Sequence, residues 1–417
     1  MTRPLAGSIA PRRRPAEAGF TLVELMVAVT GGLFVSVVVF ALASQGSRFY
    51  QRESRVADAT LSVIAGFERL QSDIARAGFM ASPNIRQDPS LCQSLPASGN
   101  ALLPGLAALR VTRPDATGDP AQNGIEPDQL LLSGNYTSSD HFPIEGVNAA
   151  TLRVALQPNI GPLARAGYPG MTADDRDAYL NAMFPAGRAV RIVDAQGRTQ
   201  YSVISGVDAG AAPQIVLDPA VTLTFRGGNS SLCGLTGGVE TNAVINVVNF
   251  IRYELANLSD DASYAAIYGD PNPFDAGRVD LVRSELDPHD GTVIGGTQEI
   301  VAEYAVDFQV GLTAVQTRVG QDVTALATIA PGDAAVLAWA GDSLLNPVQG
   351  PHLVRAVRVR LSVRSREPDR DAPIVAGGAV APGLYRVGLG DNGSAPFARV
   401  RTLQTDVMLD NLAEVAW

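Results

Sequence analysis

Lysine is absent from this sequence: all 32 basic residues of the 417-residue chain are arginine. A Walker A phosphate loop, the strand lysine of a protein kinase and a Schiff-base enzyme each depend on a lysine amine. The sequence therefore excludes these three classes of enzyme.

Other patterns of catalysis and metal binding are missing as well. The chain has three histidines and two cysteines, and it contains no Cys-x-x-Cys, His-Glu-x-x-His or Gly-x-Ser-x-Gly segment. We predict no catalytic residue, no cofactor and no metal site, and we interpret the protein as a non-enzyme. Because charged residues make up only 18% of the chain and apolar residues 46%, we expect a folded protein with a sizeable core.

A long uncharged run follows a basic N-terminus. Residues 1–19 contain four arginines and one glutamate, whereas no charged residue lies between Leu25 and Ser44. This run of 20 residues is about long enough to cross a hydrocarbon core as a helix. Because arginine-rich flanks stay in the cytoplasm, we predict a single span of the inner membrane, with the C-terminal part of the chain in the periplasm.

Glu24 directly precedes the uncharged run. An ionised carboxylate within a membrane span costs about 2.5–3.5 kcal/mol and usually has a functional partner. Its position alone leaves two interpretations open: Glu24 pairs with a cation in an assembly, or it contacts lipid headgroups at the membrane interface.

The segment Gly-Phe-Thr-Leu-Val-Glu-Leu-Met-Val-Ala, which starts at Gly19, resembles the prepilin signal of type IV pilins and type II secretion pseudopilins. The resemblance implies that a prepilin peptidase removes residues 1–19 by cutting between Gly19 and Phe20. It also implies that the new amine of Phe20 is methylated and that the apolar helix stays on the mature subunit. Glu24 would be the fifth mature residue and would act in subunit assembly.

Helical periodicity continues past the apolar run. We predict one helix from Phe20 to about Phe79, in which residues 20–44 span the membrane and residues 45–79 form an amphipathic second half. The second half has one apolar stripe that should carry a globular domain. This stripe consists of Val56, Val63, Phe67, Leu70, Ile74 and Ala77.

The rest of the chain, residues 80–417, contains short alternating runs between Gly, Pro, Asn and Asp, a pattern typical of antiparallel sheet. We therefore predict an α+β protein with a long N-terminal helix and a β-rich domain with long loops; the prepilin resemblance makes this a type IV pilin-like fold. The predicted strands are Leu109–Thr112, Gln129–Ser133, Leu152–Leu156, Ala189–Val193, Tyr201–Ile204, Val221–Phe225, Ala243–Leu255, Val279–Arg283, Glu299–Leu312, Leu353–Ser365 and Thr402–Leu409.

Two of these predicted strands have complementary charged faces. Opposite their apolar residues, Glu299–Leu312 carries mainly acidic side chains and Leu353–Ser365 carries arginines. We predict that they lie side by side, where each pair of opposite charges stabilises a sheet by about 0.2–1 kcal/mol. The alternative is an exposed arginine ridge that attracts an anionic partner such as DNA.

Both cysteines, Cys92 and Cys233, lie in the part predicted to be exported. An even number of cysteines in an oxidising compartment favours a disulfide. Closing a loop of this length would stabilise the fold by about 5 kcal/mol in the chain-entropy model. The alternative is two unpaired buried thiols.

Acidic clusters could supply oxygen ligands for calcium. They lie at residues 174–177 and 260–261, with Asp270 and Asp275 near the second cluster. Neither stretch has the twelve-residue spacing of a calcium loop, so we favour solvated acidic loops.

Further segments resemble the PilW-type minor pilins of type IV pili. The resemblance covers residues 20–79 and about 243–365, and with it we assign residues 243–417 to a PilW-like part, whereas residues 80–242 resemble no family. It implies a partnership with other minor pilins and the major pilin in a priming or tip complex, first in the inner membrane and then in the extracellular pilus. The matching segments are residues 67–79, 250–255, 281–283, 306–310 and 354–361.

Two alternatives within this resemblance remain. Pseudopilin J of type II secretion shares the leader and the helix end, but its members are usually much shorter. A pilus-tip adhesin could use residues 80–242 to bind a surface or DNA. A membrane-anchored periplasmic enzyme is disfavoured by the missing catalytic motifs.

Overall fold

The protein is described here by a computed structural model. Its chain divides into two compact units, Met1–Ser54 and Arg55–Trp417. The predicted cleavage between Gly19 and Phe20 lies outside the described residues. The structure describes residues 21–94, 102–226, 233–240, 242–268, 273–317, 324–341, 344–368, 384–388, 397–413 and 415.

A single helix, α1 (Leu22–Ala75), contains most of the predicted helix. Its segment Leu22–Ser47 has a mean hydropathy of 2.5 and buries none of its residues, so it is long and apolar enough to span a membrane. The helix ends four residues earlier than we predicted, because turns follow Ala75 and Gly78 takes a left-handed φ of 75°.

The unit from Arg55 is β-rich, and all pairings between its named strands are antiparallel. The structure thus confirms the α+β class and the antiparallel β-rich domain. One sheet has the strand order β1-β2-β8-β9-β10. Its strands are β1 (Leu109–Thr112), β2 (Gln129–Gly134), β8 (Val244–Ala256), β9 (Asp280–Leu286) and β10 (Glu299–Ala302).

The first half of β8 also closes a six-stranded barrel. Val244 and Ile245 pair with β3 on one edge, while Val244–Val248 pair with β5 on the other. The remaining pairs complete the ring β8-β3-β4-β7-β6-β5. The other barrel strands are β3 (Phe142–Asn148), β4 (Arg153–Leu156), β5 (Ala189–Val193), β6 (Thr199–Asp208) and β7 (Gln214–Leu217).

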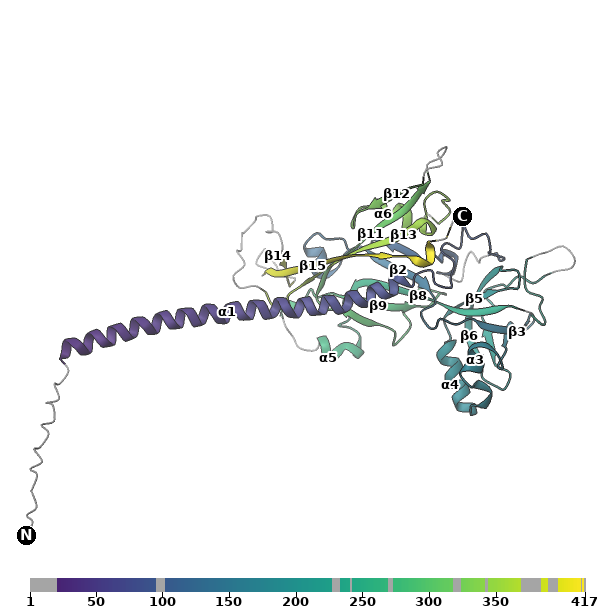
Figure 1. The fold of residues 1–417 in the computed structure, drawn as a ribbon, viewed down its shortest axis with the longest axis horizontal. Helices are drawn as coiled ribbons and strands as arrows, with labels where there is room; N and C mark the ends of the chain where they lie inside the picture. The colour runs from purple at the N-terminus through teal and green to yellow at the C-terminus, as the bar shows by residue number, and fades with distance from the viewer. Residues whose placement is uncertain are drawn as a thin grey trace, which may run out of the picture. The chain divides into compact units, whose positions relative to one another are not determined.

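The barrel has its own hydrophobic core, which includes Phe142, Ile192 and Ile245. Two helices, α3 (Gly161–Arg165) and α4 (Ala173–Met183), are inserted between β4 and β5. In Figure 1 the teal barrel strands, α3 and α4 lie on the opposite side of this unit from β11, β13 and β15. Most of the barrel therefore lies in residues 80–242, the part of the chain without a family resemblance.

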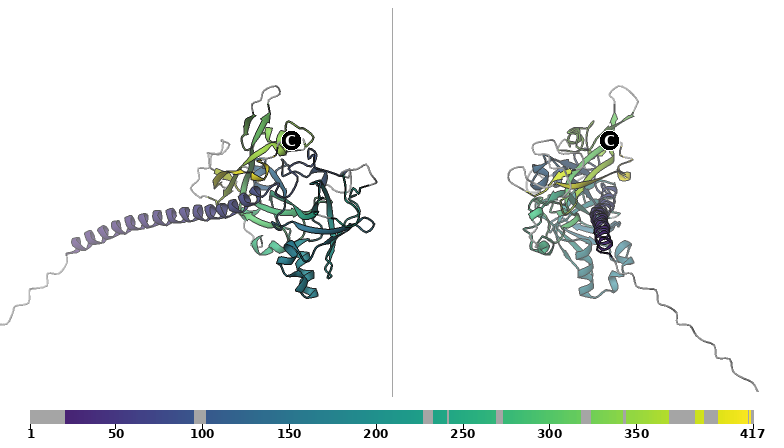
Figure 2. Two further views of the ribbon diagram at one scale, coloured as in Figure 1. Left: turned by 45° about the vertical axis from the view of Figure 1, so that its right-hand side comes forward. Right: turned by 90° about the vertical axis from the view of Figure 1, so that its left-hand side faces the viewer.

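A second sheet has the strand order β12-β11-β13-β15-β14. Figure 2 shows its green and yellow strands beside the second half of α1. Helix α6 (Ala335–Ala340) packs against β11 of this sheet and β1 of the other. The strands are β11 (Ala305–Thr317), β12 (Thr324–Ile329), β13 (Val354–Arg364), β14 (Leu384–Arg386) and β15 (Phe397–Met408). The described residues also form two further short α-helices, α2 (Gly118–Gln122) and α5 (Ala265–Tyr268).

The predicted apolar stripe is buried from Val63 to Ala77, whereas the side chain of Val56 lies outside the described part of the structure. Val63, Phe67, Leu70 and Ile74 belong to one core together with residues from both sheets, among them Tyr253 of β8, Phe308 of β11 and Leu361 of β13. Burying each such side chain stabilises the fold by about 1.5–3 kcal/mol. This core attaches the second half of α1 to the β-rich unit.

Several predicted strands are confirmed, but others are wrong. The predicted strand Val221–Phe225 contains only an isolated bridge at Phe225. The predicted strand Glu299–Leu312 is two strands, because the chain turns at Tyr304 and passes from the first sheet to the second. The strands that we did not predict are β3, β7, β12 and β14.

Candidate functional site

Thr21 and Glu24 form a reciprocal cap at the start of α1. One carboxylate oxygen of Glu24 accepts hydrogen bonds from the backbone N–H and the hydroxyl of Thr21, both at 3.0 Å. In return the Thr21 hydroxyl oxygen accepts from the Glu24 N–H at 3.2 Å. This capping box fixes where the helix begins. The other carboxylate oxygen has no hydrogen bond within the described residues.

We did not predict the role of Thr21, although its spacing from Glu24 matches the capping-box pattern Thr-x-x-Glu. The cap holds the Glu24 carboxylate at the helix end and leaves one oxygen available to a further donor. A protonated amine or a guanidinium group would be a suitable donor, because a carboxylate accepts several hydrogen bonds.

Three hydroxyls of the apolar segment have hydrogen-bond partners within the helix. The hydroxyls of Thr30, Ser36 and Ser44 donate to backbone carbonyls three or four residues earlier, at 2.8–3.1 Å. Such bonds let hydroxyls lie in an apolar environment without a partner from outside. Glu24 is the one charged residue of the segment Leu22–Ser47.

A buried carboxylate attaches the second half of α1 to the first sheet. Asp73 is only 3% exposed. Its Oδ2 atom accepts from Arg283 Nε of β9 at 2.6 Å and from the Tyr253 hydroxyl of β8 at 2.8 Å. The Asp73 carbonyl accepts from the Tyr136 hydroxyl at 2.8 Å. Burial raises the pKa of both tyrosines, so that their hydroxyls stay protonated and continue to donate.

Gly66 lets α1 lie directly against the backbone of β10. A Cβ atom at this position would overlap the carbonyl oxygen of Val301. Only glycine permits this approach without a shift of the helix. Together, Gly66 and Asp73 fix the position of α1 against the first sheet.

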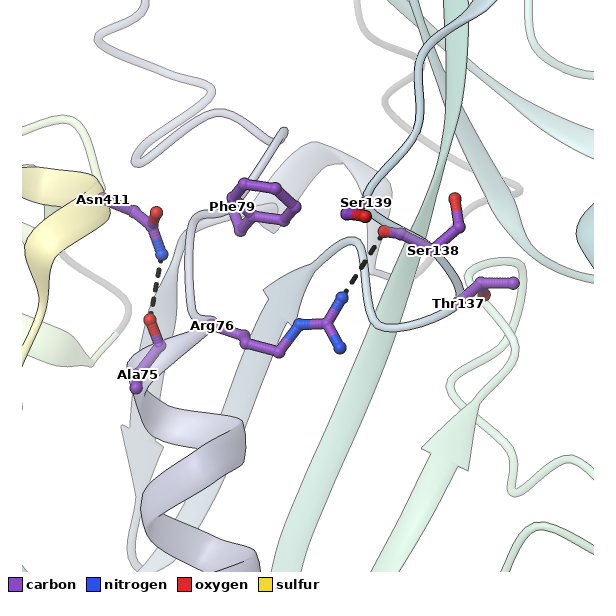
Figure 3. Close-up of a pocket in the computed structure, with 7 residues that line it drawn as sticks. All are labelled: Ala75, Arg76, Phe79, Thr137, Ser138, Ser139 and Asn411. Atoms are coloured by element: carbon purple, nitrogen blue, oxygen red, sulfur yellow. Dashed lines mark hydrogen bonds between the residues drawn. The ribbon is translucent and has the colours of Figure 1, made fainter. Parts of the chain in front are cut away.

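The C-terminal end of α1 borders a shallow cavity of about 420 Å³. Figure 3 shows Arg76, whose guanidinium donates to the carbonyls of Asn135 and Ser138 at 2.9 and 3.4 Å. From the other side Asn411 donates to the carbonyls of Ala75 and Ala77. The Asn411 bonds satisfy carbonyls at the helix end, and the Arg76 bonds hold the loop of Asn135 and Ser138 beside it. We interpret the cavity as part of that helix end.

Cys92 and Cys233 form the predicted disulfide. Their Cα atoms lie 5.5 Å apart, although 141 residues separate them in the sequence. The backbone N–H of Cys92 also donates to the carbonyl of Thr199 in β6 at 2.9 Å. The disulfide therefore joins the segment before β1 to the segment between β7 and β8.

The predicted pairing of acidic and basic strands is confirmed in part. β11 and β13 are neighbours, and Arg360 contacts Asp307 at 3.0 Å. Arg358, however, pairs with Asp406 of β15 at 2.6 Å, a partner that we did not predict. Glu299 contacts Arg69 of α1 at 3.6 Å, because Glu299 belongs to the other sheet.

The acidic clusters have local structural roles. Asp174 and Asp175 lie in the first turn of α4, where the Thr172 hydroxyl accepts from the Asp175 N–H at 3.2 Å. The Asp261 side chain accepts from the Ser263 N–H at 2.8 Å. In the described part of the chain, no group of three or more His, Cys, Asp or Glu residues could hold a metal ion. Asp270 lies outside that part.

Comparison with known proteins gave no match: no family model, no curated protein and no solved structure is similar to this chain.

Proposed function

We propose that this protein is a minor pilin of the PilW type that acts in the assembly of type IV pili. The supporting observation is the first part of α1, in which an exposed apolar segment contains one charged residue, Glu24, one turn after Thr21. Directly before Thr21 the sequence has Gly19 and Phe20, the residues at which the prepilin resemblance implies cleavage and methylation.

Assembly would move this apolar segment from lipid into contact with neighbouring helices. A buried carboxylate without a cation is strongly penalised, whereas a paired one is tolerated. The amine of Phe20 on a neighbouring subunit would supply the cation, and this pairing would set the register between subunits. The free oxygen of Glu24 would accept this amine, while Thr21 holds the other oxygen.

Complementation of a deletion strain tests the proposal. Glu24→Ala should leave cleavage and membrane insertion intact, but it should abolish or sharply reduce surface pili and co-purification with other minor pilins. Glu24→Gln should give an intermediate result, because the amide keeps a hydrogen bond and loses the charge. Ser36→Ala is the matched control, since Ser36 bonds only within its own helix.

Intact mass of the membrane-extracted protein gives the second measurement. We expect a chain that begins with methylated Phe20. Retention of residues 1–19 in cells with an active prepilin peptidase would contradict the proposal, and so would wild-type piliation by the Glu24→Ala protein. Co-purification with secretion pseudopilins in place of pilins would favour the pseudopilin J alternative.

A further inference from the structure

Strand β12 has an open outer edge. It lies at one end of the second sheet, and its inner edge pairs with β11 from Thr317↔Thr324 to Leu312↔Ile329 without a register shift. Within the described part of the chain, no hydrogen bond joins its outer edge to another segment. Alternate residues of an edge strand present an unpaired N–H and C=O. β12 is therefore a template for one more strand.

The opposite edge of the same sheet is covered. The side chain of Asn123 accepts from the Arg386 N–H of β14 and donates to the Arg386 carbonyl, both at 3.0 Å. In the other sheet, α1 lies against the backbone of edge strand β10 at Val301. β12 differs from both, because no hydrogen bond from a side-chain amide or a helix to its outer edge is found among the described residues.

The sequence of β12 also lacks the usual protection of an edge strand. Natural edges carry charges, prolines or bulges that prevent pairing with another chain. Residues 324–329 contain no charge and no proline. Leu326, at the middle of the strand, is 65% exposed.

Residues 324–328 read Thr-Ala-Leu-Ala-Thr, which is the same in both directions. An antiparallel pair of two identical strands is two-fold symmetric, so each residue must suit its mirror position. With the axis at Leu326, leucine faces leucine, each alanine faces an alanine and each threonine faces a threonine. Leu–Leu contacts bury apolar area, Thr–Thr pairs stabilise antiparallel sheets, and no like charges meet.

We propose that β12 is a homodimer interface at which two copies of this protein pair edge to edge. The two second sheets then form one continuous sheet, with β12 of one copy antiparallel to β12 of its partner. The proposal is independent of the proposed role in pili, because it depends only on this strand.

Cysteine cross-linking of the full-length protein in membranes tests the pairing. In the paired state the two Leu326 Cβ atoms lie about 4.5–5.5 Å apart, close to the separation in a disulfide. Leu326→Cys should therefore give a covalent dimer on mild oxidation, several-fold above the controls. The native cysteines do not interfere, since they are bonded to each other.

Two matched controls separate this register from random collision. Met408→Cys places a thiol at another exposed apolar position of the same sheet, 62% exposed. Thr324→Cys alone should not form dimers, because in the paired strands the two copies of residue 324 lie four residues, or about 13 Å, apart. A mixture of Thr324→Cys and Thr328→Cys chains should cross-link, since these residues face each other.

The proposal also predicts how to break the dimer. Leu326→Asp places two carboxylates opposite each other in the paired strands. When Leu326→Asp is added to both the Thr324→Cys chain and the Thr328→Cys chain, their cross-linking should fall to the background level. If Leu326→Cys dimerises no more than Met408→Cys, the proposal is wrong. It is also wrong if Leu326→Cys traps a different protein in place of a second copy.

Discussion

The Tyr253 hydroxyl of β8 donates to the Asp73 carboxylate of α1 at 2.8 Å, and both residues are buried. Arg283 of β9 contacts the same carboxylate oxygen at 2.6 Å. A buried ion pair contributes little net free energy when intact, but the loss of one partner leaves an uncompensated charge. The position of α1 on the first sheet therefore depends on this cluster.

Asp73→Ala should lower the free energy of unfolding by about 3–5 kcal/mol, because Arg283, whose side chain is only 11% exposed, would lose its carboxylate partner. Tyr253→Phe should cost less, about 0.5–1.5 kcal/mol, since it removes one hydrogen bond. Chemical denaturation of the detergent-solubilised protein provides the measurement. Glu68→Ala is the control: Glu68 is exposed on the same helix, and its loss should change stability by at most about 0.5 kcal/mol. Equal effects of Asp73→Ala and Glu68→Ala would contradict the prediction.

Gly66→Ala should also destabilise the fold, by about 1–3 kcal/mol, because the new methyl group overlaps the Val301 carbonyl. Helix propensity alone predicts the opposite sign, since alanine favours a helix over glycine by about 0.5–1 kcal/mol. The sign of the measured change therefore separates the two effects. Gly46→Ala is a suitable control, because no atom outside its own stretch of helix lies within 4 Å of the added Cβ. A stabilising Gly66→Ala substitution would show that α1 does not approach β10 this closely.

Asp307 gives the stability a defined dependence on pH. Burial raises the pKa of its carboxyl above the ordinary value, although Arg360 opposes the shift. Between the ordinary pKa of about 3.9 and the raised value, the folded state binds more protons than the unfolded state. The contribution of Asp307 to stability therefore falls as pH rises through this window.

Replacing Asp307 with asparagine should remove this dependence. The free energy of unfolding of the wild type, minus that of Asp307→Asn, should decrease as pH rises above about 3.9. Denaturant titrations at a series of pH values measure this difference. Asp406→Asn is the comparison with the opposite sign, because the hydrogen bond from Arg358 lowers the pKa of Asp406. Parallel pH profiles for wild type and Asp307→Asn would disprove the assignment.

The helix and many strands could be predicted because their signals are local. Residues such as Phe67, Leu70 and Ile74 recur at helical spacing, and all three are buried on one side of α1. The sheet switch at Tyr304 has no local signal, since the alternation of apolar residues continues through it. Tyr304 takes a φ of 54°, and its N–H donates to Asp280 of β9 at 2.7 Å. That partner is far away in the sequence, so the turn could not be predicted from the neighbouring residues.

At the candidate site, too, residues with a local sequence signal could be predicted, whereas residues that depend on distant partners could not. Glu24 could be singled out because a charge beside a long apolar run is unusual in sequence. Asp73, in contrast, looked like one of many charged residues on the polar faces of the helix. Its partners Tyr253 and Arg283 lie 180 and 210 residues further along the chain. Helix α4 was missed for a different reason: its acidic first turn resembled a loop, although Thr172 and Asp175 have the spacing of a cap.

Strand β8 has a mechanical consequence. It is 13 residues long, and its first half closes the barrel while its second half lies between β2 and β9. A pulling force on the barrel along this strand would be carried by its covalent backbone as far as Tyr253, and from there by a hydrogen bond to α1. Because β8 has neighbours on both edges, the force would load many hydrogen bonds in shear, at the same time. β8 thus joins the barrel to the first sheet, in which β2 and β9 pair with its two edges. Tension between the barrel and this sheet does not have to pass through a flexible linker.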